Sequence, residues 1–126
     1  MKKIINTPNA PAPIGPYNQA ILTENTLYTS GQIAIHPTSG ELILDDIKKE
    51  TNQVMQNIKA ILIAANMTLD NVIKASIFIS NMNSFQEINE VYGSFFNNEI
   101  APARETVQVA RLPKDVNVEI SVIAVK

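Results

Sequence analysis

The sequence predicts an α+β domain in which two helices cover one face of a mostly antiparallel mixed sheet. Two segments carry apolar residues at helical spacing, and five shorter runs are rich in β-branched and aromatic residues. These segments follow the order β-β-α-β-α-β-β, which is typical of a two-layer α+β architecture. The length of 126 residues favours one domain over residues 1–126, because no repeat or interdomain linker divides the chain.

Residues 1–16 predict an extended segment without a helix. Proline fixes the backbone angle φ and lacks an N–H group, so a proline-rich segment rarely forms a helix. After it, Tyr17–Leu22 and Thr26–Ile35 are predicted strands, and the turn-forming residues 36–40 end this part of the chain. Four of the seven prolines lie in the extended segment: Pro8, Pro11, Pro13 and Pro16.

Two helices are predicted further along. The first spans Asp46–Ala65, which contains no glycine or proline, and polar residues such as Glu50 are expected to fill its exposed surface. The second begins near Ser84, whose spacing to Glu87 is that of a capping box, in which both side chains satisfy free backbone donors. An apolar stripe, interpreted as core packing, follows this helix: Phe85, Ile88, Val91, Tyr92, Phe95 and Phe96.

Three further strands are predicted at Val72–Ser80, Glu105–Ala110 and Asn117–Val125. We expect the last two to pair as a hairpin closed by residues 111–116. Alternate residues of a strand point to opposite faces, so Glu119 shares a face with Ile123 and Val125. Two helices can cover only the other face. The uncovered face is too apolar to remain in water, which predicts a homo-oligomer that packs sheets together.

The composition argues against several classes of function. A net charge of -2 and a pI near 5.3 leave no basic field for a nucleic-acid partner. The absence of cysteine removes thiolate catalysis and cysteine-ligated metals, and the single histidine, His36, leaves no histidine-rich metal site. The four glycines are too dispersed for a phosphate-binding loop. Without a targeting segment or an apolar run of ~20 residues, a cytoplasmic protein is expected.

Two charged residues are candidates for chemistry. Arg104 and Arg111 are the only arginines, and a guanidinium binds a carboxylate through two parallel hydrogen bonds, which lysine cannot do. Arg104 could hold a substrate carboxylate or, equally, an ion pair at an oligomer interface. Glu119, on a half-buried strand face, could have a raised pKa and act as a general acid or base. Pairing with a lysine or with backbone donors across an interface is the simpler account of Glu119.

Other polar positions carry weaker signals. Tyr17 could supply a hydroxyl to a site or pack as an aromatic residue in a turn. Ser30 places a hydroxyl beside Gly31, where a ligand could reach a backbone N–H, although a tight bend is the simpler explanation. His36 lies in a proline-bounded turn, which favours an exposed loop residue over a catalytic one.

The order and spacing of short motifs along the whole chain resemble those of the RidA/YjgF family of reactive-intermediate deaminases. Each motif is weak alone, but their sequence is highly specific. The motifs are GPY (15–17), YTSGQI (28–33), INEVY (88–92), PAR (102–104), VARLPKDV (109–116) and VEI (118–120).

This resemblance implies a chorismate-mutase-like fold and a homotrimer with clefts between its subunits. The implied activity is the cofactor-free hydrolysis of 2-imino acids or their enamine tautomers to 2-oxo acids and ammonia. Such substrates, 2-aminoacrylate/2-iminopropanoate and 2-iminobutanoate, leave pyridoxal-phosphate enzymes that act on serine or threonine. The resemblance places the carboxylate-binding arginine at Arg104 and the acidic site residue at Glu119. The implied substrate-binding positions are Tyr17, Ser30, Gly31, Asn89, Arg104 and Thr106.

Four residues depart from the family's usual pattern. Glu105 and Thr106 stand where a small residue and a cysteine are common, and Ala34 and His36 replace the usual proline and asparagine. Because strand side chains alternate, Glu105 should point away from Arg104. The family's cysteine contributes mainly backbone contacts, so Thr106 need not abolish activity. Ala34 and His36 could reshape the cleft.

The resemblance also suggests a mechanism and its rivals. Arg104 would fix the substrate carboxylate, and Glu119 would polarise a water molecule and return a proton to the departing ammonia. A non-enzymatic module that binds small carboxylates and reports to a partner is the main alternative, and a ribonuclease or translation inhibitor is a weaker one. If the last two strands form a hairpin, Arg104 and Glu119 of one chain lie ~13 Å apart along the strands. We therefore expect each cleft to take these two residues from different subunits.

Overall fold

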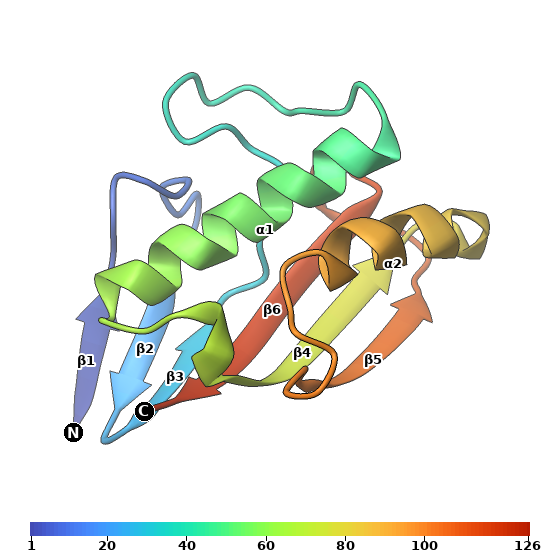
Figure 1. Cartoon of the computed structure of the whole chain (residues 1–126). Coiled ribbons are helices and arrows are strands. Elements are labelled where there is room, and N and C mark those ends of the chain that lie inside the picture. Colours follow the sequence, from blue (N-terminus) through green and yellow to red (C-terminus); the bar gives the residue numbers. More distant parts are fainter.

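Two amphipathic helices pack against one face of a six-stranded sheet in the computed structural model, which describes residues 1–126 (Figure 1). Helix α1 spans Ile47–Ala64 and begins at Asp46, whose Oδ1 accepts a hydrogen bond of 2.8 Å from the backbone N–H of Lys49. Helix α2 spans Phe85–Gly93. The helices are close to their predicted bounds because their apolar periodicity is continuous.

The start of α2 differs from the expected capping box. Ser84 is the N-cap residue, but its side chain makes no capping hydrogen bond. A short 3₁₀ turn at Met82–Ser84 leads into the helix instead, and it begins where the side chain of Asn81 accepts a bond from the N–H of Asn83. The backbone of Ser84 is therefore already turned, and its hydroxyl does not reach the helix N–H groups.

The sheet has the order β1-β2-β3-β6-β4-β5, in which only β4 and β5 run parallel. The strands are β1 Lys2–Ile5, β2 Ala20–Thr23, β3 Thr26–Thr29, β4 Val72–Ile79, β5 Ala103–Gln108 and β6 Val118–Val125. The first strand was not predicted, because it lies within residues 1–16, for which the prolines predict only an extended segment. It pairs with β2, so that the proline-rich segment is a connection between two strands.

The expected hairpin of the last two strands is wrong. β6 lies between β3 and β4, and β4 separates it from β5 at the edge of the sheet. Every second residue of β6 is fully buried, which suits a central strand, whereas no residue of β5 is buried. The more apolar strand therefore occupies the centre, although it is the last along the chain.

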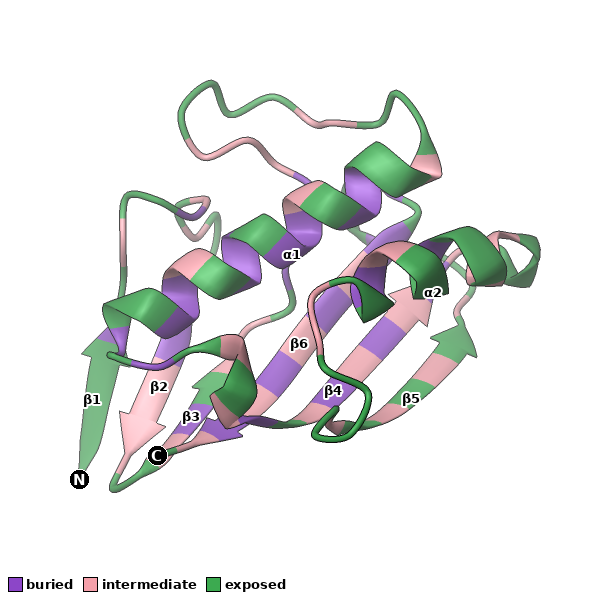
Figure 2. Ribbon diagram, viewed as in Figure 1, coloured by how far each residue is buried: buried purple, intermediate pink, exposed green.

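The core lies between the sheet and the helices, where the buried face of β6 meets α1 (Figure 2). The opposite face of the sheet is only partly covered. A second, smaller cluster of Ile33, Leu112 and Val116 packs with Phe78 on that side, while Tyr28 and Val107 remain 48% and 40% exposed. We call this the open face. Neither helix is long and apolar enough to cross a membrane.

Candidate functional site

The register of the sheet places Arg104 and Glu119 on opposite faces. In β4, Ala75 is fully buried under the helices, whereas Phe78 is on the open face. Arg104 is paired with Ala75, and Glu119 is paired with Phe78. Paired residues of neighbouring strands point to the same side. Arg104 therefore points to the helix side and Glu119 to the open face, which the hairpin register did not predict.

Glu119 lies in a hollow that also includes Tyr17, Ser30, Gly31 and Pro113, which we call the carboxylate pocket. Gly31 makes the close approach possible. A Cβ atom at this position would be only 2.8 Å from Cδ of Glu119, so no larger residue fits without displacing the carboxylate. The sequence alternative of a simple tight bend at Gly31 does not explain this approach.

Backbone hydrogen bonds hold the two sides of this pocket together. Gln32 and Ile120 form an isolated antiparallel bridge, with N···O distances of 2.8 and 3.1 Å. Ser30 is tied to the preceding segment, because its Oγ donates a bond of 2.5 Å to the carbonyl of Asn18. The hydroxyl of Ser30 is therefore engaged in holding the strand end.

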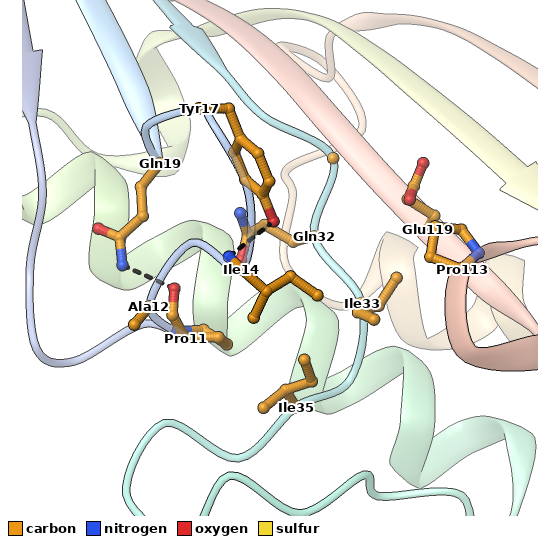
Figure 3. A pocket seen from close by; sticks show the side chains of 11 residues that line it. Pro11, Ala12, Ile14, Tyr17, Gln19, Gln32, Ile33, Ile35, Pro113 and Glu119 are labelled. Carbon is orange, nitrogen blue, oxygen red and sulfur yellow. Dashed lines mark hydrogen bonds between the residues drawn. The ribbon is translucent and has the colours of Figure 1, made fainter.

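The proline-rich segment forms a second wall of the carboxylate pocket (Figure 3). Gln19 is 2% exposed, and its Nε2 donates to the carbonyls of Ala10 and Pro11 at 3.2 and 2.8 Å. The hydroxyl of Tyr17 accepts a bond of 3.5 Å from the N–H of Ile14. Sequence reasoning missed Gln19, because it stands beside the equally polar Asn18 in the predicted strand Tyr17–Leu22 and so carried no signal of burial.

The electrostatics of Glu119 favour proton transfer. Its side chain is half-buried and makes no hydrogen bond or ion pair within the chain. Burial therefore raises the pKa of Glu119 above its ordinary value. The only other titratable residue lining this pocket is Tyr17. Pairing with a lysine is not seen within one chain.

Arg104 belongs to a separate hollow on the helix side, which we call the arginine pocket. Nη1 of Arg104 donates a bond of 2.7 Å to Oδ1 of Asn89. The guanidinium carbon lies 5.1 Å from the ring centre of Tyr92 and 5.7 Å from that of Phe85, which are cation–π distances. The hollow is lined by Asn89, Tyr92, Gly93, Phe96, Asn98, Ala101, Pro102 and Arg104.

The two arginines differ in their partners. Arg111 forms a two-bond ion pair with Asp115, whereas Arg104 has no carboxylate partner within the chain. Its fork of donors is oriented by Asn89 and two aromatic rings, yet it keeps donors for a further acceptor. This arrangement suits the binding of a small carboxylate.

Two buried hydroxyls near Arg104 lack hydrogen-bond partners. They belong to Tyr92 and to Thr106, which is paired with the buried Ile77 and so points to the same side as Arg104. Burial raises the pKa of Tyr92 to about 12, and the nearby Arg104 opposes this change. Tyr92 therefore remains a neutral phenol. Tyr92 is buried, as its predicted place in the apolar stripe of α2 requires. Two rings of this stripe, those of Phe85 and Tyr92, also orient Arg104.

Glu105 points away from Arg104, as the alternation of the strand predicts. Its carboxylate lies 2.9 Å from Nζ of Lys74 and accepts a bond of 2.5 Å from Oγ of Ser76, on the open face. These contacts lower the pKa of Glu105, the bond from Ser76 most of all. Glu105 therefore does not compete for the guanidinium within the chain.

The other two departures lie outside both pockets. Ala34 is fully buried in the core. The Nδ1 atom of His36 accepts bonds from the N–H groups of Thr38 and Ser39, so His36 shapes its own turn. No group of three or more histidine, aspartate or glutamate side chains is close enough to hold a metal ion.

The fold and these two pockets define the class of protein, an α+β domain suited to binding small molecules. A family model described as Endoribonuclease L-PSP matches residues 7–126. A RutC family protein of Pyrococcus horikoshii is 53% identical over 126 residues, which cover 100% of this chain and 99% of the relative. A protein of Escherichia coli named "Putative reactive intermediate deaminase TdcF" is 47% identical over 128 residues, covering 100% of this chain and 98% of the relative.

A crystal structure of Escherichia coli TdcF with bound serine is also similar to this chain. It superimposes with a TM-score of 0.93 at 45% sequence identity and covers 98% of each chain. The chain belongs to the family of these proteins, the RidA/YjgF or L-PSP family. The family expected from the sequence motifs is confirmed, and so is the α+β fold.

Proposed function

We propose that this protein hydrolyses 2-imino acids and their enamine tautomers to 2-oxo acids and ammonia in clefts between the subunits of a homotrimer. One observation carries the proposal. An oriented guanidinium without a carboxylate partner and a carboxylate with a raised pKa lie on opposite faces of the same sheet. A second copy of the chain can bring its carboxylate pocket to the arginine pocket of the first, so that both groups contact one small substrate.

The surface of the subunit supports this assembly. β5 is an edge strand whose outward backbone groups have no partner strand in the chain, and the open face carries exposed Tyr28 and Val107. Edge strands and apolar faces of this kind are normally covered. A cyclic trimer covers both and uses the same pair of surfaces three times.

Arg104 binds the substrate carboxylate in the proposed mechanism. Its two-bond grip fixes C2 of the imine toward the neighbouring subunit, where Glu119 lies. Asn89 and the rings of Phe85 and Tyr92 keep the guanidinium in place before the substrate arrives. Preorganisation of this kind lowers the entropic cost of reaching the reactive geometry.

Glu119 transfers the protons. Its carboxylate takes a proton from water as the water oxygen bonds to C2 and the C=N electron pair moves to the nitrogen, and Glu119 then passes this proton to the nitrogen to give a carbinolamine. Glu119, again ionised, takes the hydroxyl proton of the carbinolamine and delivers it to the amino nitrogen, so that the C–N bond breaks, its electron pair leaves with ammonia and the carbonyl forms. A carboxyl group with a raised pKa is closer to the operating pH and serves both steps better. Gly31 packs against Glu119, and in this proposal its backbone N–H orients the substrate nitrogen.

The proposed function also agrees with the relatives. TdcF carries the name of a reactive-intermediate deaminase and has been crystallised with serine, an amino acid that has a carboxylate like the proposed substrates. The net charge of -2 and the isolated His36 make ribonuclease chemistry a poor fit for this chain.

A coupled assay tests the proposal. A dehydratase generates the imine from serine or threonine, and the appearance of 2-oxo acid is followed with and without this protein. We expect acceleration with wild-type protein, and loss of that acceleration in Arg104→Ala but not in the matched control Arg111→Ala. Unaccelerated hydrolysis together with saturable binding of 2-oxobutanoate would favour the carboxylate-binding module instead. RNA cleavage that survives Arg104→Ala would favour a ribonuclease.

A further inference from the structure

Glu50 is the only charged residue that the fold buries completely. It lies in α1 and is 0% exposed, although the sequence placed it on the outer surface of that helix. A buried carboxylate normally has a cationic partner. Glu50 has none, because the ion pairs of the chain involve other residues. Such a costly group needs a reason to be there.

The carboxylate of Glu50 binds the start of β6. Its Oε2 accepts hydrogen bonds from the backbone N–H groups of Asn117 and Val118, at 2.8 and 3.3 Å, and its Oε1 accepts one of 2.8 Å from Nδ2 of Asn117. Three donors thus converge on one carboxylate. Hydrogen bonds to an ionised acceptor are about twice as strong as neutral ones.

These contacts lie one and two residues before Glu119. On one side, Ser80 fixes the same point of the chain, because its N–H donates a bond of 3.1 Å to the carbonyl of Asn117. On the other side, Gln32 fixes Ile120 through the isolated bridge. Glu119 is therefore held between two anchored points, and Glu50 anchors the first from the helix layer.

The carboxylate pocket has little tolerance for movement of this strand. The side chain of Glu119 packs directly against Gly31, and a Cβ atom at position 31 would already be too close to the carboxylate. Glu119 also has no side-chain hydrogen-bond partner, so the position of its carboxylate depends on the backbone of β6 and on the packing against Gly31.

We infer that Glu50 is a positioning residue, which fixes the start of β6 so that Glu119 stays in its desolvated place against Gly31. This inference rests on the proposed function only for its kinetic consequence. A glutamine cannot replace Glu50 without loss, because one of its two ends is a donor and would face the donors of Asn117 or Val118.

The first test is the variant Glu50→Gln, studied in the intact oligomer. We expect the pKa of Glu119, followed by NMR of ¹³C-labelled glutamate and assigned with Glu119→Gln, to fall toward its ordinary value as the carboxylate gains water. For imine hydrolysis we expect kcat to fall ~10- to 100-fold while KM stays unchanged, because Arg104 is untouched. Within one chain Tyr17 is the only other titratable group lining the pocket, and the Arg104 that the proposed trimer brings beside Glu119 is the same in every variant. Differences in the pKa of Glu119 between variants therefore report on burial.

The double variant Glu50→Gln/Asn117→Asp provides a rescue. It exchanges donor and acceptor across the contact, so the new amide at position 50 can donate to the new carboxylate at position 117 while the amide oxygen accepts from the backbone. We expect most of the titration shift and of kcat to return. The matched control is Thr51→Val, which removes the bond of 2.7 Å from a buried neighbour on α1 to the carbonyl of Ile47. Thr51→Val should lower the melting temperature and leave the pKa of Glu119 and kcat unchanged.

Some outcomes would overturn the inference. One is that the pKa of Glu119 in Glu50→Gln equals that of wild type. Another is that Thr51→Val changes the pKa of Glu119 as much as Glu50→Gln does. If Glu50→Gln does not fold, Asn117→Ala changes an exposed residue and removes the Nδ2 bond to Glu50 together with the bond of 3.3 Å from Oγ of Ser80 to Oδ1 of Asn117. An unchanged pKa of Glu119 in that variant counts equally against the inference. If wild-type protein does not accelerate imine hydrolysis, the proposed function fails, but the titrations still decide the role of Glu50.

Discussion

The arginine pocket and the carboxylate pocket are built by different means. Arg104 is held by side chains, through a hydrogen bond to Asn89 and contacts with two aromatic rings of α2. Glu119 has no side-chain partner and is placed by the backbone of β6 and by the missing side chain of Gly31. The difference teaches that side chains can orient a guanidinium and still leave it free donors, whereas a carboxylate can be held in place while its own hydrogen bonds remain unmade. In the proposed function the first is the binding group and the second is the proton-transfer group.

The largest expected effect tests the carboxylate pocket. Glu119→Gln should slow imine hydrolysis ~10²- to 10⁴-fold, because the amide cannot take a proton. Binding of 2-oxobutanoate, measured by calorimetry, should remain, since Arg104 is intact. Glu105→Gln is the matched control and should retain activity, because Glu105 is paired with Lys74 away from both pockets. Equal activity of Glu119→Gln and wild type would remove Glu119 from the mechanism.

The next effect tests the arginine pocket. Arg104→Lys should weaken substrate binding nearly as much as Arg104→Ala, because a lysine cannot form two parallel bonds to a carboxylate. Losing one charge-assisted hydrogen bond costs ~1.5–3 kcal/mol, which is a ~10- to 150-fold rise in the dissociation constant of 2-oxobutanoate. Arg111→Lys alters an exposed ion pair and should have little effect. Native affinity in Arg104→Lys would refute the two-bond grip.

A smaller effect is expected from Gly31→Ala. The added Cβ would displace the carboxylate of Glu119 but would not strain the backbone, because Gly31 does not have a positive φ. We expect kcat to fall ~10-fold, as for other small misplacements of a reacting group. Wild-type protein is the reference for this measurement. The readout is the ratio of the two kcat values, and a ratio near one contradicts the close packing.

Mixing subunits would show whether the two pockets act on one substrate. Trimers of Arg104→Ala and of Glu119→Gln should each be inactive. After subunit exchange, about a quarter of the shared clefts in a random cyclic trimer have both an intact arginine and an intact carboxylate. Activity should then return to about a quarter of wild type. No recovery, with exchange verified by mass spectrometry, would place both residues of each site in the same subunit.

The smallest effect is on stability. Because burial raises the pKa of Glu119, the folded state binds its proton more tightly than the unfolded state does. Stability from this group is therefore present below the unfolded pKa and is lost as the pH rises through the folded pKa. Glu119→Gln should be slightly more stable than wild type at neutral pH. The difference in melting temperature should disappear in acid, and a constant difference would contradict the burial of the charge.

The sequence predicted the local features of this fold well. Helix α1 lies within one residue of its predicted bounds at each end, since its periodicity is uninterrupted. The pairing of strands was predicted poorly, because β6 joins β3 and β4, which are distant in sequence, and nothing in a strand's own residues names its neighbour. Lys2–Ile5 was missed for the same reason, since its partner β2 follows the whole proline-rich segment.

The candidate site shows the same division. The motifs indicated Tyr17, Gly31 and Glu119, and these three do line one hollow. That Arg104 faces the other way depended on the position of β5 beside β4, which no single segment reveals. Gln19 and Glu50 were missed because a polar residue has the same identity whether it is exposed or buried. Only the converging donors and acceptors around them show their role.

The central place of β6 has a consequence for the synthesis of this protein. β6 leaves the ribosome after the other five strands, yet it pairs Thr26 with Val125 and links the two halves of the sheet. Until it arrives, the nascent chain presents the unpaired edges of β3 and β4, which are templates for misassociation. A premature stop just before β6 therefore leaves two separated half-sheets. Such a product should depend on chaperones or be degraded, although every residue of the arginine pocket has already been made.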